Sequence, residues 1–372
     1  MEILISFIIP FIILLTIVVF IHEYGHYYFA KKYGVGITDF SIGFGKELFG
    51  FNDKSGTRWK FCAIPLGGYV KFFGDRNVFS QSEQEELLKK YDKKDQGRLF
   101  VTKPLYQRSL IVAAGPFANF ILAIFIFTFI YMFAGKDFTP AQIQEVQPES
   151  PAFVAGMKSG DIIKSINNKE VKSIMEVSAF INTSSSNTIN ISILRNNKEL
   201  NFIVEPKIVK GEDSLGNQAN KKIIGIKISP LNEEINRQRL GPATALYYGV
   251  KETLFVIQAS WNFIISMFKG TGDSSQLGGP IKIAKITGQV AKLGFIAFLS
   301  IMAYISISLG FINLFPIPML DGGHLMFYAF EKILGRPLTQ RTQEGFFRIG
   351  LFLLISLMFF TTFNDLRDLG LF

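Results

Sequence analysis

The sequence predicts a polytopic α-helical membrane protein with four transmembrane helices, a membrane-associated β-hairpin sheet and one inserted domain. Three observations carry this prediction: an apolar composition, an H-E-x-x-H motif inside an apolar run, and a second polar cluster inside another apolar run. Hydrophobic residues make up 48% of the 372 residues, and the mean hydropathy is +0.28. Such a chain is too apolar for an ordinary soluble protein and too long for one domain.

Four segments are long enough to cross a bilayer, which needs roughly 20 apolar residues. The chain is expected to divide into a first transmembrane helix (1–30), a cytoplasmic-side β-hairpin and polar loop (31–108), a second transmembrane helix (109–134), an inserted domain (135–230), an amphipathic linker region (231–293), a third transmembrane helix (294–328), a cytoplasmic loop (329–345), a fourth transmembrane helix (346–363) and a tail (364–372). Within the linker region, Thr253–Phe268 is apolar but short and carries several amide and hydroxyl side chains. This composition favours a helix lying in the membrane interface over a fifth span.

Charges in the short loops predict the orientation. Lys31 and Lys32 follow the first span, and basic residues surround the connection between the third and fourth spans: Lys332, Arg336, Arg341 and Arg348. Basic short loops stay in the cytoplasm, so both of these helix ends are expected there and the long inserted region is expected outside.

The remaining composition excludes other classes of protein. The net charge of +9 fits basic cytoplasmic loops, and no basic stripe with interleaved aromatic residues indicates binding of nucleic acid. The single cysteine, Cys62, excludes an intrachain disulfide and a cysteine-rich zinc site.

The H-E-x-x-H motif is His22-Glu23-Tyr24-Gly25-His26, within the first apolar run. On a helix the two histidines leave the same face about one turn apart, which suits two ligands of one Zn²⁺. Glu23 is then placed to act as the general base on the attacking water. Polar groups of this kind are costly in a bilayer unless they have partners and a function. The motif therefore indicates a metalloprotease that acts within the membrane.

The second cluster is Asn313-Leu-Phe-Pro316-Ile-Pro318-Met-Leu-Asp321-Gly-Gly-His324. The two prolines should break the helix, and broken backbone at membrane depth is tolerated where it is buried in protein or lines a wet cavity. Asp321 is the expected third zinc ligand, because it lies about as far along its segment as the histidines lie along theirs. If the first and third helices run in the same direction, the three side chains reach the same depth.

Two neighbours of Asp321 leave alternatives open. Asn313 could donate a hydrogen bond to the substrate or to a developing oxyanion, or it could join two helices. His324 could bind the metal itself, but we expect it to support a ligand by contact, because two histidines and a carboxylate are the commoner hydrolytic set.

A β-hairpin is expected directly after the first span. Residues 38–45 and 57–73 alternate apolar and polar side chains, with turn residues 52–56 between them. Gly67 and Gly68 leave the backbone open to close approach, so an edge strand here could pair with an unwound substrate segment. The alternative is a membrane-associated loop with no role in substrate binding.

The two motifs together resemble the site-2 protease family of intramembrane zinc metalloproteases, and more closely its bacterial regulator-of-sigma-E protease branch. Other stretches are similar to further signatures of that branch: Phe40–Gly45, Ile64–Lys71, Ala113–Phe120 and Leu277–Ala284. The resemblance covers most of the chain apart from the polar segment 79–100. It implies a zinc metalloendopeptidase of the bacterial cytoplasmic (inner) membrane. Its partners would be the lipid bilayer and single-span proteins already cut outside the membrane, such as an anti-sigma factor, and remnant signal peptides.

The inserted domain resembles a PDZ domain over residues 147–171, with a Ser-Pro-Ala start, an Ala-Gly turn and Gly-Asp before a strand; β segments are expected at 188–194 and 200–205. The best-known members of the branch carry two such domains in tandem, and here one is found. Because PDZ folds bind peptide ends by strand addition, the domain could recognise the C-terminus of a cut substrate, or it could exclude substrates with large ectodomains.

Two rival classes remain at this point. A membrane-anchored metalloprotease with a cytosolic active site would need ligands outside the spans, where no histidine lies. A non-enzymatic PDZ-containing membrane scaffold would leave the intramembrane polar residues unexplained.

Overall fold

The computed structural model describes residues 4–74, 90–184, 186–212, 218–231, 234–270 and 277–368. They form two compact units, one built from the chain up to Ile126 together with Gly279–Phe363, and the other from Phe127–Gly278 together with the end of the chain from Asn364. Much of the polar segment 79–100 lies outside the described residues; its described part includes a short helix, α3 (Lys93–Gln96), and the start of the 3-10 turn η2 (Phe100–Thr102).

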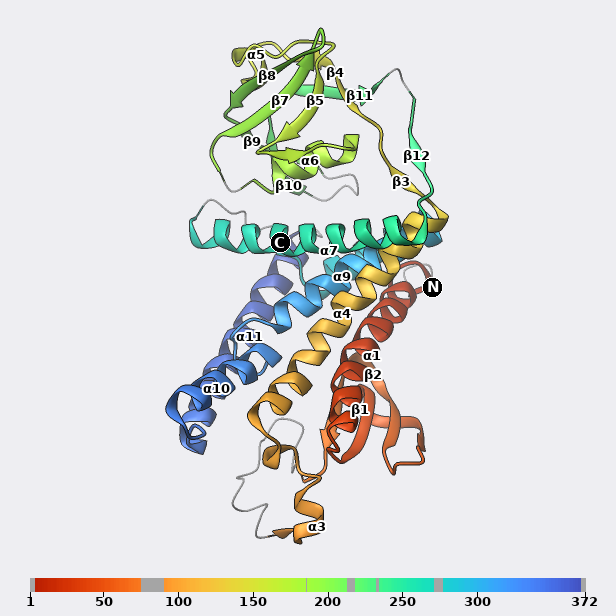
Figure 1. The fold of residues 1–372 in the computed structure, drawn as a ribbon, viewed down its shortest axis with the longest axis vertical. Coiled ribbons are helices and arrows are strands. Elements are labelled where there is room, and N and C mark those ends of the chain that lie inside the picture. Colours follow the sequence, from red (N-terminus) through yellow and green to blue (C-terminus); the bar gives the residue numbers. More distant parts are fainter. Residues whose placement is uncertain are drawn as a thin grey trace. The chain divides into compact units, whose positions relative to one another are not determined.

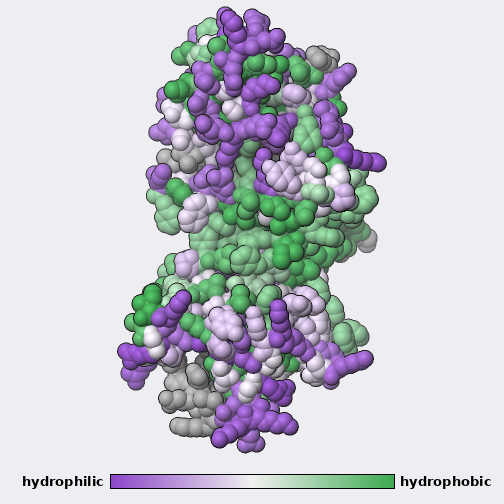
Figure 2. Space-filling model, viewed as in Figure 1, coloured by the Kyte–Doolittle hydropathy of each residue, from purple (hydrophilic) through white to green (hydrophobic). Residues whose placement is uncertain are grey.

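Long apolar helices dominate the first unit. They are α1 (Ile9–Lys32, after the π-helical turn η1, Leu4–Ile8), α4 (Leu105–Phe133), α9 (Phe295–Asn313) and α11 (Gln340–Asp368), with the shorter α8 (Pro280–Lys292) and α10 (Asp321–Leu334). Four helices of the described chain are long and apolar enough to cross a membrane: Ile5–Lys32, Leu105–Phe133, Phe295–Asn313 and Arg341–Arg367. This agrees with the four predicted spans. Figure 2 shows hydrophobic residues gathered in a band over part of these helices, as expected of surfaces that face lipid.

The helix directions agree with the predicted common depth of the two polar clusters. In Figure 1, α1 and α9 run in the same direction, and α4 runs against them. Close approach between helices depends on small residues. A Cβ at Gly25 of α1 would lie 2.3 Å from the carbonyl oxygen of Ala114 in α4, and a Cβ at Gly310 of α9 would lie 2.8 Å from that of Pro116. The helix α4 therefore packs tightly against both α1 and α9.

The third apolar segment differs from the prediction of one helix at 294–328. The helix α9 ends at Asn313, an irregular stretch holds both prolines, and α10 begins at Asp321. The prolines explain the interruption, because each lacks a backbone donor and clashes with the preceding turn. The stretch folds back onto α10, where a Cβ at Gly322 would lie 2.2 Å from the carbonyl oxygen of Phe315.

The β-hairpin follows α1. Strand β1 (Ile37–Asn52) pairs antiparallel with β2 (Arg58–Phe72), and both are interrupted by bulges. The first strand is longer than the expected 38–45. The prediction ended where the alternation of apolar and polar residues stops, but the strand continues past that point. Its far part is exposed, including Leu48, Phe49 and Phe51.

Asp53 fastens the hairpin turn to α1. Its carboxylate accepts hydrogen bonds from the Tyr27 hydroxyl (2.8 Å) and from the backbone N–H groups of Ser55 (2.8 Å) and Thr57 (2.9 Å). Burial acts to raise the pKa of the Asp53 carboxyl, but these hydrogen bonds outweigh it and hold the pKa below its ordinary value. The turn is therefore held by an ionised carboxylate at neutral pH.

The second unit contains a β domain and one long helix. The elements in chain order are β3 (Lys136–Asp137), β4 (Ala141–Val146), α5 (Pro151–Val154), β5 (Ile162–Ile166), β6 (Lys169–Glu170), α6 (Ile174–Asn182), β7 (Ile189–Arg195), β8 (Lys198–Val204), β9 (Lys207–Glu212), β10 (Gln218–Ile223), β11 (Ile226–Pro230), β12 (Arg237–Gln238) and α7 (Pro242–Phe268). The main sheet has the strand order β11-β4-β5-β7-β8, with β6 paired to β5. The predicted β segments 188–194 and 200–205 correspond to β7 and β8.

The helix α7 starts earlier than the expected Thr253, with Pro242 in its first turn. It does not belong to the four described helices that could cross a membrane. Phe255 packs edge-on against Phe180 of α6 (5.4 Å between ring centroids), while Leu254 and Trp261 remain exposed. One face therefore meets the β domain and another stays apolar and uncovered, as expected of a helix in a membrane interface.

Candidate metal centre and active site

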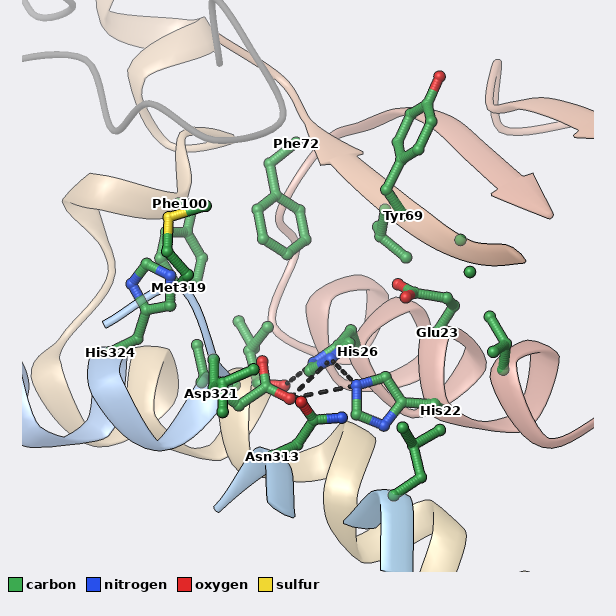
Figure 3. A pocket seen from close by; sticks show the side chains of 18 of the residues that line it. His22, Glu23, His26, Tyr69, Phe72, Phe100, Asn313, Met319, Asp321 and His324 are labelled. Carbon is green, nitrogen blue, oxygen red and sulfur yellow. Dashed lines mark hydrogen bonds and ion pairs between the residues drawn. The ribbon is translucent and has the colours of Figure 1, made fainter. Parts of the chain in front are cut away.

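His22 and His26 of α1 meet Asp321 of α10 at one point, although Asp321 lies about 300 residues later in the chain. Asp321 Oδ2 lies 3.2 Å from His22 Nε2 and 3.6 Å from His26 Nε2, and the two Nε2 atoms are 3.3 Å apart. Figure 3 shows the three side chains converging. In the part of the chain that the structure describes, they form the one group of three or more His, Cys, Asp or Glu residues that could hold a metal ion.

The donor set fits zinc. Two imidazole nitrogens and one carboxylate oxygen leave a coordination position open, which is typical of catalytic zinc sites. Asp321 Oδ2 is buried and accepts no hydrogen bond, so a cation would satisfy it. Gly115 of α4 keeps the place clear, because a Cβ there would lie 2.3 Å from His26 Nε2 and 2.9 Å from His22 Nε2.

A backbone carbonyl orients His26. His26 Nδ1 lies 2.9 Å from the carbonyl oxygen of Ile111, which can only accept a hydrogen bond. Nδ1 therefore carries the proton, and the lone pair of Nε2 faces Asp321. This contact was absent from the sequence-based prediction, because nothing in the sequence pairs Ile111 with His26.

An amide side chain holds His22 in the same way. The Asn119 carboxamide of α4 lies 3.2 Å from His22 Nδ1 through its nitrogen, and its oxygen is buried without a partner. When His22 Nε2 binds a metal, Nδ1 carries a proton and needs an acceptor. Rotation of the Asn119 carboxamide by half a turn brings its oxygen to His22 Nδ1 as the acceptor. Asn119 was missed as a site residue, although a fully buried amide inside an apolar span is a signal of function.

Glu23 lies beside the three converging side chains and is not one of them. In Figure 3 its carboxylate extends from α1 into the cavity beside strand β2 and stays apart from the Asp321 carboxylate, and it accepts a hydrogen bond from the backbone N–H of Val70. Glu23 is therefore outside the ligand group and lines the same cavity.

The site opens into a cavity of about 360 Å³ lined by residues of α1, β2, α4, α9 and α10. Asn313, Gly67, Gly68 and His324 all line it, so the structure brings every predicted site residue to one place. Asn313 points toward His22 and Asp321 in Figure 3, whereas His324 lies on the far side of Asp321. The His324 ring packs against Phe347 (5.7 Å between ring centroids), and its supporting role stays a prediction.

The structure gives Gly68 a packing constraint that the sequence did not show, and its role toward a substrate stays a prediction. A Cβ there would lie 2.7 Å from the carbonyl oxygen of Ser41, 3.0 Å from Val19 Cγ1 and 3.1 Å from Glu23 Cγ. Gly68 is therefore required for the packing of β2 on β1 and α1. Gly67 has φ +110° and would direct a Cβ at the ring of Phe44, so its glycine is needed for backbone conformation.

Comparison with known proteins identifies the family. The description "Peptidase family M50" matches residues 10–357. The chain belongs to this peptidase family. A protein of Mesorhizobium japonicum provisionally named a zinc metalloprotease is 40% identical over 361 residues, which cover 96% of this chain and 98% of that protein. One of Agrobacterium fabrum with the same description is 40% identical over 364 residues, covering 98% and 96%. Metalloprotease MmpA of Caulobacter vibrioides is 33% identical over 379 residues, covering 96% and 94%.

Among solved structures, the PDZ domain of the SdrC-like protein of Listeria monocytogenes is 21% identical and covers 24% of this chain and 85% of its own, with a TM-score of 0.20. That score is too low to support an argument about the β domain.

Family membership confirms the resemblance to site-2 proteases, although the branch stays a prediction. This M50 chain is a zinc metalloprotease, which excludes the non-enzymatic scaffold. Its apolar helices are those of a membrane protein.

Proposed function

We propose that this M50 peptidase cleaves the transmembrane segments of single-span membrane proteins. The observation that carries the proposal is the position of His22 and His26 inside a helix apolar and long enough to cross a membrane. A metalloprotease with a cytosolic active site would need its ligands elsewhere. Ligands in a span place the chemistry at membrane depth, where the accessible peptide bonds belong to other transmembrane segments.

His22, His26 and Asp321 would hold the zinc ion. Bound zinc supplies a Lewis acid that polarises the scissile carbonyl. Glu23 takes a proton from the attacking water and returns it to the leaving amine. The Asn313 amide donates a hydrogen bond to the oxyanion that develops on the substrate. Asn119 and the Ile111 carbonyl keep both imidazoles in the required tautomer.

Strand β2 would hold the substrate. A peptide bond within a helix is shielded by its own hydrogen bonds, and opening it in lipid costs several kcal/mol for each unsatisfied group. Strand β2 lines the cavity beside Glu23, and its edge offers replacement backbone partners. The exposed Leu48 (71%), Phe49 (61%) and Phe51 (47%) support a hairpin whose far end enters the membrane.

The proposal also covers the orientation of the protein in the membrane and the class of its substrates. The basic short loops favour a hairpin side that faces the cytoplasm and a β domain that lies outside, and we propose the inner membrane of a bacterium as the location. The β domain, read as a PDZ domain, would either bind the new C-terminus of a substrate cut outside the membrane or exclude uncut ones. Anti-sigma factors and remnant signal peptides are the substrates that the family resemblance suggests.

The test uses the full chain in liposomes with a single-span substrate whose products are identified by mass spectrometry. We expect a cut inside the apolar segment, and Glu23→Gln should slow it by about 10²–10⁴-fold, as removal of a general base does. Cleavage confined to a soluble part of the substrate would contradict the proposal, as would unchanged turnover by the Glu23→Gln variant.

A further inference from the structure

The zinc ligands come from helices that need a common support. His22 and His26 share α1, but Asp321 is the first residue of α10, directly after the irregular stretch 314–320. A short irregular stretch alone defines the place of a helix poorly. Some contact along α10 must therefore fix how far Asp321 lies from the two imidazoles.

Such a contact lies toward the other end of α10. Glu331 accepts two hydrogen bonds from Arg108, from Nη2 to Oε1 (2.5 Å) and from Nη1 to Oε2 (3.1 Å). The two side chains are only 14% and 19% exposed. The Arg108 guanidinium also lies 5.1 Å from the ring centroid of Tyr328, and its Nε donates to the carbonyl oxygen of Lys103 (3.1 Å). Every part of this guanidinium is thus held in a fixed plane.

Arg108 belongs to the helix that also holds the histidines. Along α4, the Ile111 carbonyl orients His26, the Asn119 amide orients His22, and Gly115 leaves room for the metal. Arg108 ties α10 to the same helix. The structure thus presents α4 as the frame against which all three ligands are aligned.

We propose that the Arg108–Glu331 pair is a positioning element that sets the place of Asp321 relative to His22 and His26. The inference rests on the proposed metal site. Glu331 lies ten positions after Asp321 in the same helix, or roughly 15 Å at 1.5 Å per residue, so a tilt at Glu331 moves Asp321. A two-pronged arginine–carboxylate contact fixes orientation as well as distance, which a lysine cannot do.

The experiment measures how fast zinc leaves the purified full-length protein when a colorimetric chelator is added in excess. Glu331→Gln weakens the contact that fixes α10, so Asp321 should be held less firmly and zinc should leave about tenfold faster than from wild type. Arg108→Lys keeps the positive charge but cannot donate two parallel hydrogen bonds to Glu331. Its rate of zinc release should therefore rise less than that of Glu331→Gln. The exchanged pair Arg108→Glu with Glu331→Arg should release zinc more slowly than Glu331→Gln.

A matched control and a second readout separate positioning from general stability. The Lys136–Glu176 ion pair is similarly buried (10% and 25% exposed, 3.4 Å) and lies in the other unit, so Glu176→Gln should release zinc at the wild-type rate. Thermal unfolding of the zinc-free protein is measured in parallel. Wild-type zinc release by both Glu331→Gln and Arg108→Lys would overturn the inference, whatever their unfolding temperatures. Wild-type protein that binds no zinc would overturn the metal site, and the inference with it.

Discussion

At the scale of the residue, the ring nitrogens that face away from the metal decide whether the site works. Zinc needs both Nε2 lone pairs, so each Nδ1 must carry a proton and find an acceptor. Ile111 supplies a carbonyl that mutation cannot remove. Asn119 supplies a side chain, held in place where Ser306 Oγ donates to its backbone carbonyl (2.9 Å). The two histidines therefore differ in how easily their orientation is disturbed.

Replacing Asn119 should weaken zinc binding although all three zinc ligands remain in place. Asn119→Leu keeps the volume but removes the acceptor, and we expect zinc affinity to fall by about 10–100-fold. Asn119→Asp keeps an acceptor oxygen and should stay within a few-fold of wild type. Equilibrium competition with a chelator of known affinity measures both variants.

Asn313 is the matched control, because it lines the same cavity on a different helix. Asn313→Leu should keep zinc and slow cleavage, since its proposed hydrogen bond goes to the substrate. Equal zinc affinities for Asn119→Leu and wild type would show that the amide does not orient His22.

At the scale of the element, α4 explains most of the site. It packs against α1 at Gly25 and against α9 at Gly310, and it passes the metal site with a glycine. The stretch Ala113–Phe120 thus combines small residues for close approach with one buried amide. Its hydropathy is that of any apolar helix, so its role can be assigned only from its contacts with α1 and α9.

Gly115→Ala should abolish zinc binding, although alanine favours a helix over glycine by about 1 kcal/mol. The added methyl group would lie against the two Nε2 atoms, where the ion must bind. Metal analysis of the purified variant checks this.

Gly345 offers the control, because it lies in helix α11 and a Cβ there would have nothing within 4 Å. Gly345→Ala should keep zinc and unfold at the same temperature as wild type or slightly higher. Full zinc occupancy in Gly115→Ala would contradict the placement of the metal.

The parts of the site that could be predicted are those that depend on the spacing of residues close together in the sequence. The i and i+4 histidines define a helix face without any knowledge of the fold, and the two prolines mark the interruption that frees Asp321. Asn119, Ile111 and Arg108 could not be assigned roles, because each acts across helices through a pairing that the sequence does not state. The packing constraint at Gly68 was also missed, since a glycine that serves packing and one that serves a substrate look alike in sequence.

At the scale of the whole molecule, the proposed function depends on which side of the membrane each region faces. Parallel α1 and α9 bring both polar clusters to one depth (Figure 1). The basic short loops predict that the hairpin side faces the cytoplasm and the β domain the outside. In this proposed orientation, the β domain would be on the side of the membrane where a substrate receives its first cut.

Labelling of single cysteines should test the orientation, in a background where Cys62 is replaced by alanine. Lys158 in the β domain and Lys94 before α4 are both exposed. In intact cells with the outer membrane made permeable, a maleimide that cannot cross the inner membrane should label Lys158→Cys and spare Lys94→Cys. Detergent lysis should then expose both. The reverse pattern in intact cells would invert the proposed topology.

In the proposed site, His22, His26 and Asp321 hold one catalytic zinc ion, with Glu23 beside it. Metal analysis of purified full-length protein tests this most directly. We predict about one zinc per chain for wild type and for Glu23→Gln, and almost none for Asp321→Ala. Undiminished zinc in Asp321→Ala, or loss of zinc in Glu23→Gln, would contradict the assignment of ligands and base.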